Sequence, residues 1–505
     1  MGVNMGKIKN NQSVMMRDTI IYMISKGVEI VISVVMASLM TYLFAAKKLG
    51  TFSVFNIIIT VLGTVLIQWL AQSSLRFAGK YSSGKNSTNF FSTIYNVWLK
   101  INVISVLLVV IFLVLVNSNL FSYINFISEY NMVIIFGLLW FITYNTSQLV
   151  TSLLVAFRKS RLNLLLSTIT VLGKLILIYV FCSLWGSKIE WIFLSYFIAD
   201  GIVSLIGILN LKLLDKVKNG DSSKEILKEL KLYGKPLMWN MLTTSILNKS
   251  DVLLISLFLG VSSAGIYQTN YSLVATTFTM LSMAIMRGSY PTVLCVWNEG
   301  NNELANKLIS NTVRFYLIIS VPAVVGIGLL SDVIAKVLYA SEYFEGHFVM
   351  FWVALGMMLL GLCEYNIKPW ELNSKSIDIF KRNLISAIVN VILNLILVPI
   401  CGYMVAAVTT FLGYLLYFVL SRIGTRKYTQ WSLPLITYIR IAGSALIMAL
   451  IIYIFKRLFI INIMTLFLLI IMGVIVYGIL LLIFGEIKEE FEKIKEIVKF
   501  KKRSL

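Results

Sequence analysis

The sequence predicts an all-α polytopic membrane protein with about 14 transmembrane helices. Of its 505 residues, 58% are hydrophobic and only 13% are charged, so polar side chains cannot cover a water-soluble globule of this size. Apolar stretches of about 20 residues, long enough to cross ~30 Å of hydrocarbon, recur along the chain. Aromatic residues, which are counted within that 58%, make up 13% of the chain, and these favour membrane interfaces.

The spans are predicted from apolar runs bounded by charged residues, Gly, Pro or Asn. The first run is far longer than a signal-peptide core and lacks a small-residue cleavage site, so we expect it to remain as a spanning helix. The fourteen predicted spans are 19–46, 53–76, 97–117, 131–157, 162–184, 191–211, 236–259, 266–296, 312–331, 348–368, 384–400, 402–421, 436–455 and 458–484.

Basic residues indicate how the chain is oriented. The net charge is +21, but the Lys and Arg residues are spread between apolar runs, which argues against a nucleic-acid partner. Lys and Arg accumulate in cytoplasmic segments of membrane proteins. With both termini in the cytoplasm, few basic residues fall outside: Lys47, Lys48, Lys188, Lys336, Lys456 and Arg457. We therefore predict that both termini are cytoplasmic.

Cysteine and histidine provide no site. Cys182, Cys295, Cys363 and Cys401 lie in or beside apolar runs without paired spacing, so neither disulfides nor zinc are indicated. His347 is the only histidine. The sequence therefore predicts no catalytic residue, no metal site and no cofactor.

An internal repeat organises the spans. Leu49 and Gly50 follow the first span as Leu259 and Gly260 follow the seventh. Two sets of six spans in the same orientation form a parallel repeat, with a cavity between two lobes. The polar segments 215–235 and 486–505 are predicted to be amphipathic helices on the inner membrane surface, contacting lipids. The predicted domains are 1–214 (N-terminal lobe), 215–235 (linker), 236–424 (C-terminal lobe), 425–485 (two extra spans) and 486–505 (tail).

These features resemble the polysaccharide-flippase branch of the multidrug/oligosaccharidyl-lipid/polysaccharide (MOP) exporter superfamily, especially the O-antigen flippases. Local motifs are Ala46 to Gly50, the Ser250–Asp251 pair, the turn from Leu259 to Tyr267 and the run from Asn390 to Pro399. The first turn departs from the family pattern, since it is two residues short and has Ser53 where Gly is usual.

The resemblance implies a two-lobed, alternating-access exporter in the bacterial cytoplasmic membrane. Its substrate would be an undecaprenyl-diphosphate-linked oligosaccharide for O-antigen or capsule, and transport would be coupled to H⁺ or Na⁺. Further implied partners are a polysaccharide polymerase and a chain-length regulator.

Four charged residues are predicted near the middle of the membrane, where a charge facing lipid is costly. Lys249 and Asp251 precede Gly260 by 11 and 9 residues, about 16 and 14 Å along a helix. Lys174 and Asp200 lie at a similar depth in their own spans. These residues are predicted either to serve transport or to balance one another's charge.

A diphosphate needs fixed positive charge along its path. Lys249, Lys174 and Arg287 are the candidate contacts, although Arg287 could instead reach the headgroups. Asp251 and Asp200 are the candidates for ion coupling, because buried carboxylates can exchange a proton or Na⁺.

Other polar residues in the spans have their own predictions. Asn390 and Asn394, four residues apart, would line the cavity or hydrogen-bond between helices. Glu364 and Lys368 are expected to neutralise each other in part, and Arg314 is expected to extend to the headgroups.

Two other functions remain as alternatives. A cation-coupled multidrug exporter of the same superfamily commonly has twelve spans and an acidic cavity, and mid-depth lysines argue against it. A glycosyltransferase or polymerase needs a substantial outer loop with catalytic residues, but the longest outer segment, 332–347, has no such group. The sequence therefore favours a transporter over an enzyme.

Overall fold

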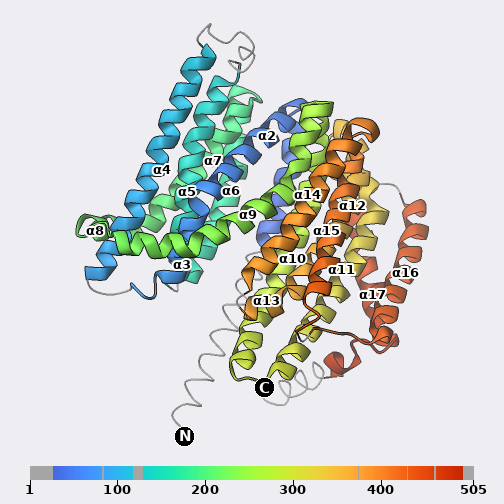
Figure 1. The fold of residues 1–505 in the computed structure, drawn as a ribbon. Coiled ribbons are helices and arrows are strands. Elements are labelled where there is room, and N and C mark those ends of the chain that lie inside the picture. The colour runs from blue at the N-terminus through green and yellow to red at the C-terminus, as the bar shows by residue number, and fades with distance from the viewer. Residues whose placement is uncertain are drawn as a thin grey trace, which may run out of the picture. The chain divides into compact units, whose positions relative to one another are not determined.

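Regular structure in the described part of the chain is entirely helical (Figure 1). The structure is a computed structural model that describes residues 27–81, 85–117, 129–157, 159–373, 375–428, 430–459 and 462–492. Twelve helices within these ranges are long and apolar enough to cross a membrane, and a shorter apolar helix, Gly27–Leu43, precedes them. The 38-residue helix α10 (Val261–Asn298) coincides with the predicted span 266–296. These helices confirm the predicted all-α class.

The chain folds into two compact units, Met1–Gln268 with Asn383–Tyr403, and Thr269–Arg382 with Met404–Leu505. The first contains Gly27–Leu43, α2 (Ala46–Gly63), η1 (Thr64–Gln68), α3 (Trp69–Phe77), α4 (Lys85–Asn117), α5 (Asn131–Ala156), α6 (Ser160–Trp185), α7 (Ile189–Leu211), α8 (Leu213–Lys218), α9 (Lys224–Leu259), the start of α10 and most of α14 (Ser376–Cys401). The second contains the rest of α10, α11 (Asn302–Leu338), η3 (Ser341–Gly346), α12 (His347–Asn366), α13 (Lys368–Leu372), α15 (Met404–Gly424), α16 (Leu435–Leu458) and α17 (Ile463–Ile483).

These units are bounded differently from the predicted lobes, 1–214 and 236–424. The difference arises because α9 and most of α14 belong to the first unit. The division into lobes therefore remains a prediction.

Helix α9 is longer than the predicted span 236–259. It begins at Lys224, inside the predicted linker, and runs through Pro236 without ending. Ser223 caps it, since the Ser223 hydroxyl accepts a 3.4 Å hydrogen bond from the Ile226 backbone N–H. Ile226 and Leu230 are buried against α3, α4 and α5. The amphipathic segment therefore has an apolar protein surface to cover, which extends the helix beyond the apolar run.

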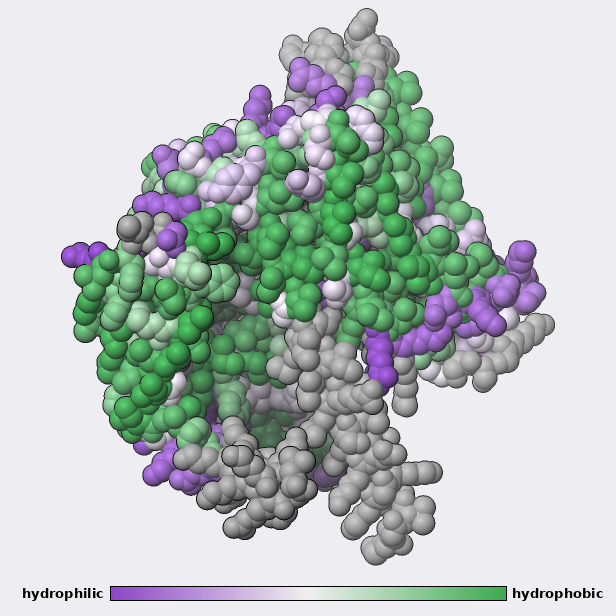
Figure 2. All heavy atoms as spheres, turned by 180° about the vertical axis from the view of Figure 1, so that it is seen from behind, coloured by the Kyte–Doolittle hydropathy of each residue, from purple (hydrophilic) through white to green (hydrophobic). Residues whose placement is uncertain are grey.

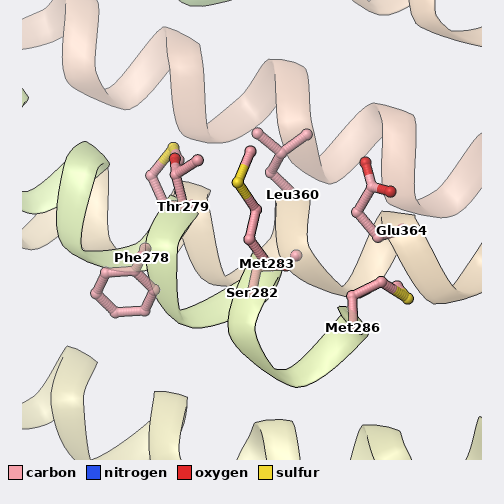
Figure 3. A pocket seen from close by; sticks show the side chains of 9 residues that line it. Phe278, Thr279, Ser282, Met283, Met286, Leu360 and Glu364 are labelled. Carbon is pink, nitrogen blue, oxygen red and sulfur yellow. The ribbon is translucent and has the colours of Figure 1, made fainter. Parts of the chain in front are cut away.

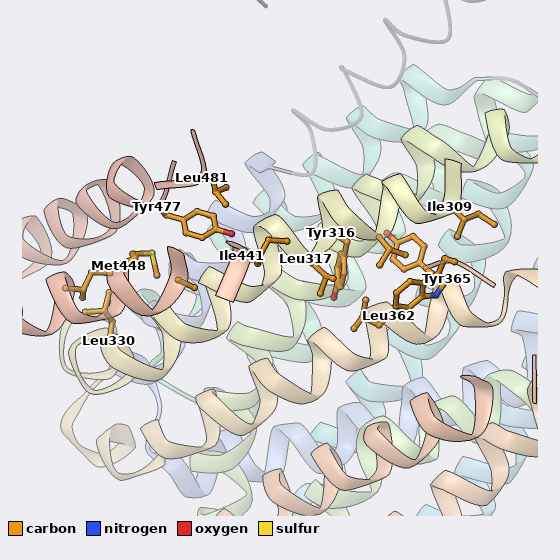
Figure 4. Close-up of a cluster of buried hydrophobic side chains, with 14 of the residues drawn as sticks. Ile309, Tyr316, Leu317, Leu330, Leu362, Tyr365, Ile441, Met448, Tyr477 and Leu481 are labelled. Atoms are coloured by element: carbon orange, nitrogen blue, oxygen red, sulfur yellow. The ribbon is translucent and has the colours of Figure 1, made fainter. Parts of the chain in front are cut away.

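The core of the second unit is formed by α11, α12, α16 and α17 (Figure 4). Tyr316 and Leu362 join α11 to α12, while Met448 and Tyr477 join α16 to α17. The predicted extra spans are thus packed into this unit.

Apolar side chains also cover much of the outer surface in Figure 2, and hydrophilic residues gather in separate patches. On α4, for example, Ile104, Leu108 and Val114 are more than half exposed. Exposed apolar faces of this extent are expected where helices contact lipid.

Candidate functional site

Asp251 is the centre of a buried polar cluster in the first unit. Its side chain is only 1% exposed, and its carboxylate accepts hydrogen bonds from the Asn394 amide at 2.7 Å and the Tyr267 hydroxyl at 2.8 Å. Asn390 extends the cluster, since its carbonyl oxygen accepts from Asn394 and from Ser250, each at 3.4 Å. Three helices, α9, α10 and α14, thus supply hydrogen-bonding groups to one place in the protein.

The tight turn between α9 and α10 brings Asp251 and Tyr267 together. Gly260 occupies this turn with a positive φ of 84°, a conformation that glycine adopts at low cost. The chain reverses there, so residues 16 positions apart come within hydrogen-bonding distance. The sequence analysis predicted the depth of Asp251 but did not identify Tyr267 as its partner.

Lys249 lies on a different face of α9 from Asp251. Two residues span about 200° around a helix, so their side chains point in nearly opposite directions. The Lys249 ammonium donates a 2.7 Å hydrogen bond to the Thr60 hydroxyl on α2. Within the described part of the chain, no carboxylate lies within ion-pair distance of this partly buried ammonium. Lys249 therefore retains donor capacity for an anion.

Lys174 is arranged differently, because it forms an ion pair with Asp200. The ammonium on α6 lies 2.9 Å from the carboxylate on α7, and the two side chains are 14% and 4% exposed. The Trp140 indole donates a further 2.7 Å hydrogen bond to Asp200, and the ammonium lies 4.5 Å from the Tyr196 ring centroid. This positive charge is thus largely compensated within the first unit.

The other residues singled out from the sequence lie in different surroundings. Asn390 and Asn394 meet in the Asp251 cluster. The Arg287 side chain lies outside the described residues. Glu364 and Lys368 act on each other electrostatically, as expected, but the Lys368 ammonium forms its ion pair with Glu371, at 2.5 Å. Residues three apart on a helix also lie on the same face, and the Lys368 ammonium binds the closer carboxylate, that of Glu371.

Arg314 does not simply extend to the headgroups, contrary to the prediction. Its guanidinium forms 2.7 Å ion pairs with Glu486 and with Glu490 at the start of the C-terminal tail. Arg440 lies 3.5 Å from Glu486 as well. These carboxylates are distant in sequence, so helical periodicity could not reveal them.

The repeat-related segments around Gly50 and Gly265, which form the first turns of α2 and α10, pack directly against each other in the first unit. A Cβ atom on Gly50 would lie 1.6 Å from the Val261 carbonyl oxygen, and one on Gly265 would lie 2.1 Å from the Ala46 carbonyl oxygen. Only glycine permits this backbone approach. The contact fixes the start of α2 against the start of α10, close to the Asp251 cluster.

The described residues contain no group of three or more His, Cys, Asp or Glu side chains that could hold a metal ion. The available chemistry is therefore hydrogen bonding and charge: one lysine without a carboxylate partner, one hydrogen-bonded aspartate and one lysine–aspartate pair. Such groups bind and release ions or polar ligands.

Sequence comparison finds relatives that are named as flippases. The chain is 27% identical over 240 residues to the probable low-salt glycan biosynthesis flippase Agl15 of Haloferax volcanii, covering 47% of this chain and 51% of the relative. It is 26% identical over 145 residues to the Bacillus subtilis lipid II flippase MurJ, covering 28% and 27%. The matches thus span about half of Agl15 and a quarter of MurJ.

Solved structures of low identity share the fold. An inward closed lipid II flippase MurJ aligns with a TM-score of 0.70 at 16% identity, covering 92% of this chain and 99% of the other. An inward-facing multidrug resistance MATE transporter of the MOP superfamily aligns at 0.61 and 13% identity, covering 81% and 94%.

A family match supplies the classification. The family described as polysaccharide biosynthesis protein matches residues 15–295, which is more than half of the chain. Together with the relatives above, this match confirms the resemblance to the polysaccharide-flippase branch of the MOP superfamily. The chain belongs to the polysaccharide biosynthesis protein family.

Proposed function

We propose that this protein translocates lipid-linked oligosaccharides across a membrane by alternating access. The observation that carries the proposal is Lys249, a partly buried cation in a spanning helix whose only bonded partner among the described residues is the neutral Thr60 hydroxyl. An unpaired charge in such a place is costly and is typical of a substrate path. Family membership and the relatives named as flippases support the same class of cargo.

We further propose that the cargo is linked to undecaprenyl diphosphate. An undecaprenyl diphosphate carrier has a charged group that must leave water, and a lysine ammonium can bind phosphate as a point charge. We assign this contact to Lys249. The end product would be O-antigen or capsule, and the location would be a bacterial cytoplasmic membrane with both termini inside. Lys174 is a weaker candidate because Asp200 already compensates its charge.

Ion coupling is assigned to Asp251 rather than to Asp200. Asp251 accepts hydrogen bonds from the neutral side chains of Asn394 and Tyr267, so a proton or Na⁺ could change its charge. Asp200 already has a cationic partner, the Lys174 ammonium at 2.9 Å.

The test uses a host that lacks its own copy of this gene. Lys249→Gln should reduce surface polysaccharide display by about 10- to 100-fold, since a hydrogen bond to a charged group contributes ~1.5–3 kcal/mol. Lys249→Arg retains the charge and should retain part of the activity. Lys188→Gln is the matched control, because Lys188 is exposed and lies outside the proposed path. Membrane levels of all variants would be compared by immunoblotting.

Two outcomes contradict the proposal. Normal display in Lys249→Gln would remove Lys249 from the path. If the wild-type chain fails to restore display but raises resistance to cationic drugs, the multidrug exporter becomes the better assignment. The MATE structure of similar fold makes that control necessary.

A further inference from the structure

A cavity in the second unit contains a carboxylate that the proposed transport path does not use. It lies between α10 and α12 and has a volume of about 290 Å³. Figure 3 shows Glu364 at this cavity beside Met283, Met286 and Leu360. The full lining is Phe278, Thr279, Ser282, Met283, Met286, Met357, Leu360, Gly361 and Glu364. Most of the wall is therefore hydrocarbon or thioether.

The Glu364 carboxylate has no ion-pair or hydrogen-bond partner among the side chains that the structure describes. Its expected partner, Lys368, binds Glu371 at 2.5 Å and lies 4.6 Å from the Tyr290 ring centroid. Glu364 therefore differs from Asp200, which has an ammonium, and from Asp251, which has two donors.

Several titratable groups surround Glu364 at longer range. Lys368 and Glu371 act on it from the following turn, while Tyr316 on α11 and Tyr417 on α15 lie within electrostatic range. Tyr290 on α10 lies beside the Lys368–Glu371 pair, and the Arg287 side chain is outside the described residues. The Lys368–Glu371 pair has no net charge, so it compensates Glu364 only weakly.

An ionised carboxylate in such surroundings is costly unless a cation or a donor is added. A metal ion such as Na⁺ needs several oxygen ligands, but the described side chains that line this cavity offer only the Glu364 carboxylate and the hydroxyls of Thr279 and Ser282. Thioether sulfurs suit soft metals instead. A proton needs a single oxygen, so it is the cation that fits this lining.

We propose that Glu364 is a proton-binding site whose loading and release accompany the transport cycle. It lies 17 residues after the start of α12, about 26 Å along the helix, and so near the end of the span that leads into α13. A proton could reach it from that side of the membrane through the cavity. The link to transport depends on the proposed function, whereas proton binding itself does not.

The first experiment measures protonation of the full-length wild-type protein in lipid vesicles. Dicyclohexylcarbodiimide, an apolar reagent that modifies protonated carboxyl groups, would be applied over a pH series and the adducts located by peptide mass spectrometry. We expect labelling of Glu364 to fall about tenfold for each pH unit above its midpoint. Glu371 is the internal control, because its carboxylate is ion-paired with the Lys368 ammonium at 2.5 Å.

Four results would overturn proton binding. Labelling of Glu364 could be missing at every pH, or it could be independent of pH. Protection by Na⁺ at constant pH would instead assign the cavity to a metal cation. If labelling occurs only in Arg287→Gln, then Glu364 is ion-paired with Arg287 and the site is not a proton site.

The second experiment tests the link to transport. Glu364→Gln mimics the protonated form, and Glu364→Asp keeps an ionisable group. We expect flipping of a fluorescent lipid-linked oligosaccharide in proteoliposomes to lose its pH dependence in Glu364→Gln and to keep it in Glu364→Asp. An unchanged pH profile in Glu364→Gln, alongside normal labelling of wild type, would refute coupling while leaving proton binding. If wild type itself flips nothing, the proposed function fails, and the labelling result still stands.

Discussion

Lys174 and Asp200 form a 2.9 Å ion pair between α6 and α7, in surroundings where neither side chain is more than 14% exposed. We predict that Lys174→Gln destabilises the protein by about 3–5 kcal/mol, because it leaves a buried charge without its partner. The double variant Lys174→Gln/Asp200→Asn should recover most of this loss. Thermal unfolding of the purified protein in detergent measures both effects.

The same variants separate structural from transport roles. A double variant that unfolds like wild type but displays no polysaccharide would show that Lys174 contacts the cargo. A Lys174→Gln single variant as stable as wild type would mean that the pair is not formed in the protein.

The close contact between the first turns of α2 and α10, at Gly50 and Gly265, leads to a second prediction. Gly50→Ala and Gly265→Ala each place a Cβ atom within about 2 Å of a backbone carbonyl oxygen, a distance that side-chain movement cannot relieve. Both variants should show strongly reduced amounts of folded protein in the membrane. Fluorescence-detected size-exclusion chromatography measures this amount.

Gly443→Ala on α16 is the matched control, since a Cβ atom there meets nothing within 4 Å. We expect it to fold at least as well as wild type, because Ala favours helix over Gly by up to ~1 kcal/mol. Normal folding of Gly50→Ala would show that the Gly50 backbone lies farther from the Val261 carbonyl oxygen than the 1.6 Å Cβ–oxygen distance implies.

The Asp251 cluster leads to a third prediction, which separates charge from packing. Asp251→Asn keeps the shape of the side chain and its ability to hydrogen-bond with Asn394, so we expect a modest loss of stability. The negative charge is lost, so transport in proteoliposomes should no longer respond to a Na⁺ or proton gradient. Transport that still follows the gradient in Asp251→Asn would assign coupling elsewhere.

Tyr267→Phe is the complementary variant. It removes one 2.8 Å hydrogen bond to the carboxylate but keeps the charge. Unfolding should become easier by about 1.5–3 kcal/mol, while the gradient response should remain.

The helices were predictable because the membrane imposes a length and a composition on each one. Apolar runs near 20 residues predicted each of the twelve candidate membrane helices within the described residues, including α16 and α17. Residues 224–235 were expected in an amphipathic helix on the membrane surface. Their continuity with the span 236–259 was not predicted, because it depends on packing against the protein rather than on lipid.

The candidate site was predictable only in part. Counting residues back from Gly260 placed Lys249 and Asp251 at middle depth, and the four-residue spacing of Asn390 and Asn394 placed both on one helix face. The expected partial neutralisation of Glu364 by Lys368 did not reveal the Lys368–Glu371 ion pair, because helical spacing permits several partners and Glu371 is closer.

Composition and local spacing were enough to predict the membrane class, the helical spans and the family resemblance. Which charges are compensated depends on the folded structure. Among the described residues, Asp200 neutralises Lys174, Tyr267 and Asn394 donate hydrogen bonds to Asp251, and Lys249 contacts only the Thr60 hydroxyl. Electrostatic pairing acts over a few ångströms in space, and helices distant in the chain supply the partners.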